Sequence, residues 1–210
     1  NSSNNLNLID YGNGCYNSNT SQCNGYGAAD YGDYTASSKW QRELPFVVTF
    51  YGVDYNDMVI NTNGWISFGN FVMYSFRNYP IPGAGGPSPM VAAFWDDLKT
   101  SSGNVYYAEY PEYVVIQWDG MKTYDNNSDE TFQIILYNKE YFPLTETGDS
   151  EIKIQYKDFN NTSNGYYPSG GTPTHGCYST IGIENQLGDM GLEYTYNNLY
   201  PEAAMTLEND

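Results

Sequence analysis

The chain has 210 residues, which is enough for one full hydrophobic core and too few for two domains of typical size. Its 25 Asp and Glu residues outnumber its 8 Lys and Arg residues, which gives a formal net charge of −17 at pH 7. This charge argues against nucleic acids and anionic membrane surfaces as partners, because both need basic residues, and it makes cations the natural counterparts. Charged residues are nevertheless only 16% of the chain, and its many Asn, Ser, Thr and Gly residues and 23 tyrosines are typical of secreted β-proteins.

The start of the chain and its hydropathy point to the same compartment. The sequence begins at Asn1 without an initiator Met, and no apolar run is long enough to span a bilayer. We therefore expect an extracellular or cell-surface protein whose signal peptide has been removed, without membrane insertion.

Residues 1–38 differ in composition from the rest, with Asn, Ser, Gly and Tyr predominating. Their one apolar patch, Leu6, Leu8 and Ile9, alternates in part with polar residues as a half-buried strand does. No partner strand lies close to it in the sequence. We predict an extended N-terminal arm over residues 1–38, followed by a domain over residues 39–210.

The domain is predicted to be all β, because short β-branched or aromatic segments alternate with turn residues and helical periodicity of useful length is absent. The predicted strands cover residues 46–51, 58–60, 65–68, 90–94, 105–108, 113–118, 131–137 and 151–156. A closing hairpin is predicted from 181–184 and 192–196, and 203–207 could add one more strand. The expected architecture is a single antiparallel β-sandwich, jelly-roll-like, with the N-terminal arm extended from it.

Two connections are informative. Asn63-Gly64 supplies the positive φ that a two-residue hairpin turn requires between flanking apolar segments. Residues 80–89 are rich in Pro and Gly, which excludes a helix or a central strand and predicts a long ordered loop over one end of the sandwich.

Several of these segments resemble a known extracellular family. They are Leu44-Pro-Phe-Val-Val-Thr-Phe-Tyr-Gly52, Val59-Ile-Asn-Thr-Asn-Gly-Trp-Ile-Ser-Phe-Gly69, Phe94-Trp-Asp-Asp97 and Thr131-Phe-Gln-Ile-Ile-Leu-Tyr137. Together they are similar to the nidogen-like (NIDO) domain and to related modules of large bacterial secreted and surface proteins. The resemblance covers residues 44–160, and less closely 181–185. It implies an extracellular β-sandwich that acts in adhesion and assembly, and no reaction.

Acidic clusters supply the candidate metal ligands. Asp125, Asn127 and Asp129 alternate as the oxygen ligands of calcium loops do, because alternating side chains of a tight loop can converge on one hard cation. Glu130 stands where an EF-hand needs Gly, so the loop is not an EF-hand. We predict a structural Ca²⁺ ion in at least one cluster, and for each single cluster a solvated acidic loop is the alternative. The further candidate ligands are Asp96, Asp97, Asp30 and Asp33.

Catalytic alternatives have little support in the sequence. Asp96 and Asp97 are adjacent on a strand, so their side chains point to opposite faces and do not flank one glycosidic bond. His175 is the only histidine, and a dyad with Cys177, two residues away, would need unusual backbone geometry. We predict that the protein is not an enzyme.

Covalent modifications are predicted in the loops. Cys15 and Cys23 enclose a short polar loop and are favoured as a disulfide over a bridge from either to Cys177, and one thiol then remains. Glycosylation is expected at one or two of the sequons, the candidates being Asn19, Asn126, Asn160 and Asn161.

Two functional hypotheses follow. The leading one is a structural subunit of a self-assembling surface fibre, in which Leu6, Leu8 and Ile9 add a strand to the neighbouring subunit and calcium offsets the repulsion between acidic subunits. The alternative is a carbohydrate- or protein-binding adhesion module of a larger secreted protein. That module would work through Tyr-rich loops, with Tyr166 and Tyr167 as an aromatic platform for a ligand.

Overall fold

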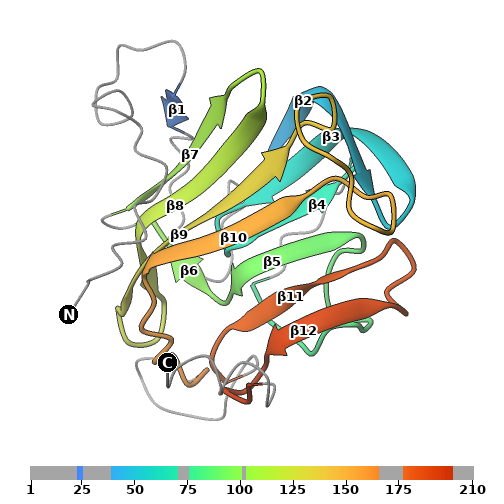
Figure 1. Cartoon of the computed structure of the whole chain (residues 1–210). Coiled ribbons are helices and arrows are strands. Elements are labelled where there is room, and N and C mark those ends of the chain that lie inside the picture. Colours follow the sequence, from blue (N-terminus) through green and yellow to red (C-terminus); the bar gives the residue numbers. More distant parts are fainter. Residues whose placement is uncertain (1–22, 26–38, 71–75, 101–102, 166–176, 201–210) are drawn as a thin grey trace, which may run out of the picture.

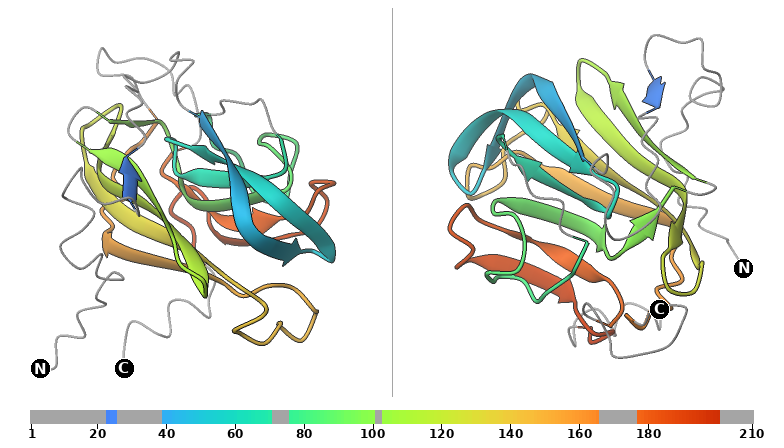
Figure 2. Two further views of the ribbon diagram at one scale, coloured as in Figure 1. Left: turned by 90° about the horizontal axis from the view of Figure 1, so that it is seen from above. Right: turned by 180° about the vertical axis from the view of Figure 1, so that it is seen from behind.

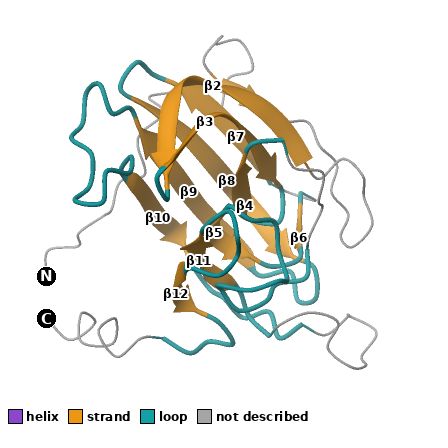
Figure 3. Cartoon of the chain, turned by 90° about the vertical axis from the view of Figure 1, so that its right-hand side faces the viewer, coloured by secondary structure: helices purple, strands orange, loops and turns teal. Residues whose placement is uncertain are grey.

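The computed structural model describes residues 23–25, 39–70, 76–100, 103–165 and 177–200. Within these ranges the chain consists of strands and loops and contains no helix (Figures 1 and 3). The strands form two antiparallel sheets that face each other as layers (Figure 2). The prediction of an all-β antiparallel sandwich is confirmed.

Sheet B runs in the order β12-β11-β5-β4-β3-β2. Strands β2 to β5 follow one another along the chain, whereas β11 and β12 come from the C-terminal part and extend the sheet beyond β5. β12 is therefore an outer strand of this sheet. The bounds are β2 (Lys39–Phe50), β3 (Val53–Asn61), β4 (Trp65–Phe68), β5 (Met90–Trp95), β11 (Thr180–Glu184) and β12 (Gly191–Thr195).

Sheet A runs in the order β1-β7-β8-β9-β10, and the short strand β6 also pairs with β8. β1 lies within the residues predicted as the N-terminal arm and pairs with β7, Cys23 opposite Ala108. The chain before residue 39 thus contributes one short outer strand to the sandwich. The bounds are β1 (Cys23–Gly25), β6 (Leu98–Lys99), β7 (Asn104–Glu109), β8 (Tyr113–Thr123), β9 (Asp129–Tyr137) and β10 (Ile152–Asp158).

The predicted strands coincide with observed strands, and the largest difference is at the start of β2. This strand begins at Lys39 rather than at residue 46. It pairs with β3 on both sides of a register shift between Glu43 and Val48. Pro45 lies in that shift, where its missing N–H removes no ladder hydrogen bond. The predicted strand at 203–207 lies outside the described residues.

The core between the sheets is largely aromatic. Phe132 of β9 stacks on Trp118 of β8 with ring centroids 5.0 Å apart, and on Phe94 of the opposite sheet at 5.6 Å. The indole Nε1 of Trp118 donates to the carbonyl oxygen of Asn61 at 2.9 Å, which satisfies its only polar atom. Each of these three side chains is at most 1% exposed, and their burial stabilises the packing of one sheet on the other.

The turn predicted at Asn63-Gly64 is present, but its predicted length was wrong. Asn61 pairs with Trp65, so the loop has three residues rather than two. Gly64 has φ +80°, and its N–H donates to the carbonyl oxygen of Asn61 at 3.3 Å, as in a type I turn followed by a left-handed residue. A Cβ on Gly64 would lie 1.9 Å from the carbonyl oxygen of Phe94. Contact with β5, which is remote in sequence, therefore also requires glycine here.

The loop predicted over residues 80–89 is present, but it covers the outer face of sheet B rather than one end of the sandwich. Ile81 packs there with Trp65, Met90 and Trp95 in a second, smaller apolar cluster. The N–H of Ile81 donates to Glu193 Oε2 at 2.8 Å, and the N–H of Gly83 donates to Glu184 Oε2 at 3.0 Å. The loop is thereby bonded to β11 and β12, and β5 is buried on both faces.

Candidate functional site

Four carboxylates gather at one end of the sandwich, and we call Asp96, Asp97, Asp125 and Glu130 the acidic corner. Asp96 and Asp97 directly follow β5 and are buried, Asp125 lies between β8 and β9, and Glu130 is fully buried near the start of β9. The chain after β10 reaches the same place, because the N–H of Asn164 donates to Asp125 Oδ2 at 2.9 Å. Two candidate metal clusters that are separate in the sequence are therefore neighbours in the fold.

Glu130 is the member of the acidic corner that the sequence analysis did not select as a ligand. Its Oε2 accepts from the N–H of Asn160 at 2.8 Å, and its Oε1 accepts from the N–H of Asn161 at 3.1 Å and from Ser128 Oγ at 2.8 Å. The side chain points inward because it has the same parity in β9 as Phe132, which faces the core. The alternation of inward-facing and outward-facing side chains along β9 is the sequence signal that could have identified Glu130.

Burial controls the charge of the acidic corner. It raises the pKa of Asp96 from 3.8 to about 8, and the nearby charges of Asp125 and Glu130 add to this rise. Hydrogen bonds from Ser163 and from the N–H of Asp97 act in the opposite direction. The pKa of Glu130 is also raised by burial, although three hydrogen bonds favour its ionised form. At neutral pH Asp96 is therefore predominantly protonated, which removes one negative charge from the cluster.

The predicted calcium loop engages other partners in this structure. Asp129 forms an ion pair with Lys122, Asp125 accepts from Asn164, and Asn127 is exposed with φ +58°. Across the described ranges, no three His, Cys, Asp or Glu side chains are grouped so as to hold a metal ion. Asp30 and Asp33 lie outside those ranges. Calcium binding stays a prediction.

The sequons differ in accessibility. Asn126 and Asn160 are exposed, whereas Asn161 is 4% exposed and its Oδ1 accepts from the N–H of Ser179 at 2.8 Å. A glycan on Asn161 would have to displace the segment that begins at Ser179. Asn19 lies outside the described residues.

After expression in a glycosylating host, we expect glycopeptide mapping to find Asn161 unmodified, with any glycan within residues 126–161 on Asn126 or Asn160. The reason is steric, since a buried Asn has no room for a glycan. Asn126 and Asn160 lie at the surface, where their amide nitrogens donate only to Thr162 and to the carbonyl oxygen of Asp129. Thr162→Ala removes the Asn160 sequon and leaves that of Asn161 intact, so it provides the control. A glycan found on Asn161 in the folded variant would contradict the buried placement.

Other predicted site residues lie largely outside the described part of the chain. This holds for Leu6, Leu8, Ile9, Cys15, Tyr166 and Tyr167, and for Cys23 only the backbone is described. Cys177 is half-buried and forms no disulfide with any cysteine in the described ranges. The predicted Cys15–Cys23 bridge, the arm contact and the tyrosine platform stay predictions.

A surface that the sequence analysis did not single out lies at the edge of sheet B. The β11–β12 turn, β12 and the turn that follows contain half of the large apolar side chains that are exposed in the described residues. Leu192 is 68% exposed and Tyr194 is 44% exposed on β12 itself. Exposed apolar groups gathered in this way mark interaction surfaces. We call this set the β12 patch, which consists of Leu187, Met190, Leu192, Tyr194 and Leu199.

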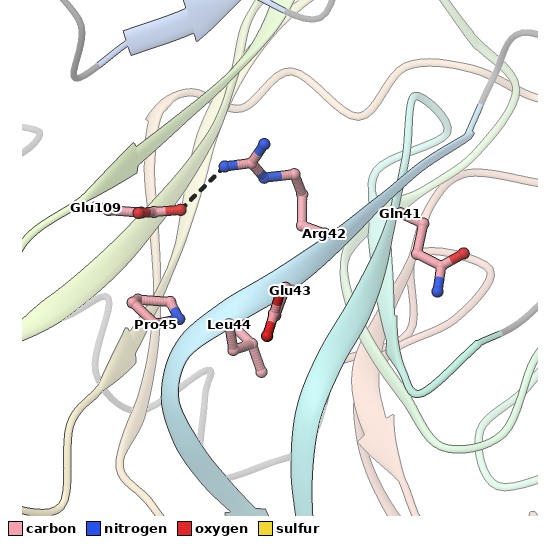
Figure 4. Close-up of a pocket in the computed structure, with 6 residues that line it drawn as sticks. All are labelled: Gln41, Arg42, Glu43, Leu44, Pro45 and Glu109. Atoms are coloured by element: carbon pink, nitrogen blue, oxygen red, sulfur yellow. Dashed lines mark hydrogen bonds and ion pairs between the residues drawn. The ribbon is translucent and has the colours of Figure 1, made fainter.

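A surface depression of about 500 Å³ lies between β2 and β7 (Figure 4). Two of its charged groups pair with each other, because Arg42 Nη2 donates to Glu109 Oε1 at 2.9 Å. The Arg42 guanidinium also lies over the Tyr107 ring, 4.6 Å from its centroid. Arg42 thus links sheet B to sheet A, and the arrangement has a structural explanation without a ligand.

These features define a class of protein: an all-β sandwich module with a buried acidic corner and an exposed apolar sheet edge. The profile of the family described as NIDO related matches residues 12–210, so the chain belongs to the NIDO-related family. NIDO-type domains are extracellular. The search of curated proteins and the search of solved structures each gave no match. Among the described residues, no helix has the length and apolar character needed to cross a membrane.

Proposed function

We propose that this protein is a non-enzymatic structural or adhesive subunit of a self-assembling extracellular fibre. The observation that carries the proposal is the β12 patch, a set of exposed apolar side chains on the outer strand β12 and on the turns at its two ends. Such a surface is costly to leave in water, and association with another chain removes that cost. Membership of a family of extracellular modules agrees with a role outside the cell.

The polar groups of the domain favour a structural role over catalysis. In the acidic corner, Glu130 and Asp125 accept hydrogen bonds from backbone N–H groups of the segment after β10. In the depression, Arg42 is paired with Glu109. These side chains hold segments of the protein together, and a catalytic pair would instead need groups directed toward open space beside a substrate.

The arm supplies the second half of the proposed contact. Leu6, Leu8 and Ile9 form an apolar segment that would add a strand to a neighbouring subunit, with main-chain hydrogen bonds providing affinity. Each subunit carries a formal charge of −17, so neighbours repel one another. Calcium bound between acidic loops would offset this repulsion, and we propose that it stabilises the polymer.

We expect negative-stain electron microscopy to show filaments of the purified native protein. The variant Leu6→Asn/Leu8→Asn/Ile9→Asn keeps the arm length and removes its apolar side chains, so it should give dispersed, folded particles. Asn4→Ser/Asn5→Ser/Asn7→Ser changes the intervening polar residues and should still form filaments. Filaments of normal length from the first variant would exclude the arm. Dispersed wild-type particles would instead favour a monomeric adhesion module.

Calcium removal is a separate prediction. Chelation should shorten or dissolve the filaments and lower their thermal midpoint, because a ligand that binds only the native assembly stabilises it by mass action. Readdition of Ca²⁺ should restore both, and Mg²⁺ at the same ionic strength is the control for general screening. An unchanged length and midpoint after chelation would remove calcium from the proposal without affecting strand addition.

A further inference from the structure

In the part of the chain that the structure describes, the two sheets end in β1, β10, β2 and β12, and the first three of these strands carry features that discourage pairing with another chain. β1 has only three residues. β2 contains Pro45 and a register shift. β10 exposes Lys153 and Lys157 and ends in an irregularity between Tyr156 and Asp158. Short length, proline, lysine and bulges are the devices that natural proteins use against edge-to-edge association.

β12 differs from these three strands. Its sequence, Gly191-Leu-Glu-Tyr-Thr195, contains no Lys, Arg or Pro, and it exposes Leu192 and Tyr194. Its one charged side chain, Glu193, accepts from the N–H of Ile81 and is therefore engaged by the loop over sheet B. A register shift with β11 occurs near Tyr194, and the pairs Ile183 with Leu192 and Glu184 with Gly191 are regular. Along these regular pairs, no described strand pairs with the outer side of β12, so its backbone groups beside Leu192 are open to a further strand.

The chain turns back beside β12 as far as Tyr200, whose ring centroid lies 5.8 Å from that of Tyr194, but the sequence after Tyr200 is poorly suited to continue as a strand along this edge. Asn197 and Asn198 have φ 52° and 57°, and the N–H of Leu199 donates to the carbonyl oxygen of Tyr196 at 3.0 Å, so a two-residue turn sends the chain back along β12. In that register the next hydrogen-bonded pair would join Tyr194 with Pro201, and proline has no N–H to donate. One residue further, Glu202 would face Glu193, which places two like charges opposite each other.

We propose that β12 is the acceptor edge for the N-terminal segment 4–9 of a second copy of this chain. This inference rests on the proposed function and names the surface that receives the arm. The segment Asn-Asn-Leu-Asn-Leu-Ile is uncharged, lacks Pro and Gly, and alternates over most of its length. It can therefore donate every backbone N–H, place Leu6 and Leu8 on one face beside Leu192, and approach Glu193 without charge repulsion.

The positions of the N-terminal arm and of β12 make the proposed contact head-to-tail. β1, through which the arm leaves the sandwich, lies at the edge of sheet A, on the opposite side of the molecule from β12 (Figures 1 and 2). The chain from Ile9 to Cys23 spans up to about 50 Å when extended, at roughly 3.4 Å per residue, which lets the segment reach a neighbour. Because donor and acceptor are different surfaces, the contact propagates into an open filament.

Cysteine cross-linking of the full-length protein tests this contact. Leu8→Cys chains mixed with Leu192→Cys chains should form a disulfide-linked dimer, and peptide mapping should show the 8–192 link. Leu8→Cys mixed with Leu144→Cys, which replaces an exposed leucine on a different loop, should give only the background of the native cysteines. A 192–192 link would instead show β12 paired with itself. A link between Leu192→Cys and Ala203→Cys within one chain would show the C-terminal residues covering the edge. Either result overturns the proposal.

Leu192→Lys adds the protective residue that β12 lacks, and it should abolish filaments while leaving the unfolding midpoint of the dispersed protein unchanged, because the side chain is already exposed. Leu144→Lys is the matched control and should leave filaments intact. Normal filaments from Leu192→Lys would overturn β12 as the acceptor and leave the fibre function standing. Absence of filaments and of cross-links in otherwise unmodified protein would overturn both.

Discussion

Replacing Gly64 with alanine is expected to destabilise the domain by more than about 3 kcal/mol and to lower its thermal midpoint by roughly 6–12 °C. Two costs combine at this position. The backbone has φ +80°, which L-residues rarely adopt, and the new Cβ would lie 1.9 Å from the carbonyl oxygen of Phe94. Since that oxygen belongs to the backbone of β5, the overlap is relieved only by separating the hairpin from the strand beside it. Urea or thermal unfolding followed by circular dichroism measures the effect.

Gly69→Ala provides a matched control for this prediction. Gly69 has φ +84°, close to that of Gly64, but a Cβ added there would have nothing within 4 Å. We expect this variant to lose only the conformational term, about 1–2 kcal/mol. The difference between the two variants isolates the steric contact with Phe94. Equal destabilisation of the two would show that the hairpin does not pack on β5 as closely as described.

Stability in the presence of a chelator is expected to decrease from about pH 4 to about pH 8, and Asp96 is the main cause. Its pKa is raised from 3.8 to about 8 in the fold, chiefly by burial. Between these values the folded state keeps a proton that the unfolded state has lost, so stability falls by up to about 1.4 kcal/mol for each pH unit. The stabilisation that comes from the Asp96 proton is fully present below the pKa of Asp96 in the unfolded state. It is lost as the pH rises through the pKa of Asp96 in the folded state. Glu130, whose pKa is also raised by burial, acts with the same sign.

Asp96→Asn should remove most of this dependence. An amide oxygen can still accept from the N–H of Asp97, a hydrogen bond of 2.8 Å in the structure, and it cannot ionise. We expect urea midpoints of the variant to change little from pH 4.5 to pH 7.5 and to equal or exceed those of the wild type at pH 7.5. Asp158→Asn makes the same chemical substitution at an exposed position and should keep the wild-type slope. Parallel pH profiles for Asp96→Asn and the wild type would contradict the assignment.

The acidic corner was only partly predictable from the sequence. Asp96, Asp97 and Asp125 could be selected from the sequence because carboxylates with few basic residues nearby are conspicuous. Their convergence could not, because it depends on the ends of strands that are separated along the chain. Glu130 was recognisable in principle, since the alternation that places Phe132 in the core also points Glu130 inward. Its partners, the N–H groups of Asn160 and Asn161, follow only from the return of the chain after β10.

The fold, too, was only partly predictable from the sequence. Period-two patterning and turn residues determined the all-β class, the positions of the strands and the family resemblance, because each depends on a few neighbouring residues. The tertiary structure decided which strands lie at the edges. β12 became an outer strand because β11 pairs with β5 rather than with β10, a choice made by packing between segments about ninety residues apart. For this reason Leu192 and Tyr194 resemble an ordinary half-buried strand in the sequence, and only the assembled sheet shows that they are exposed.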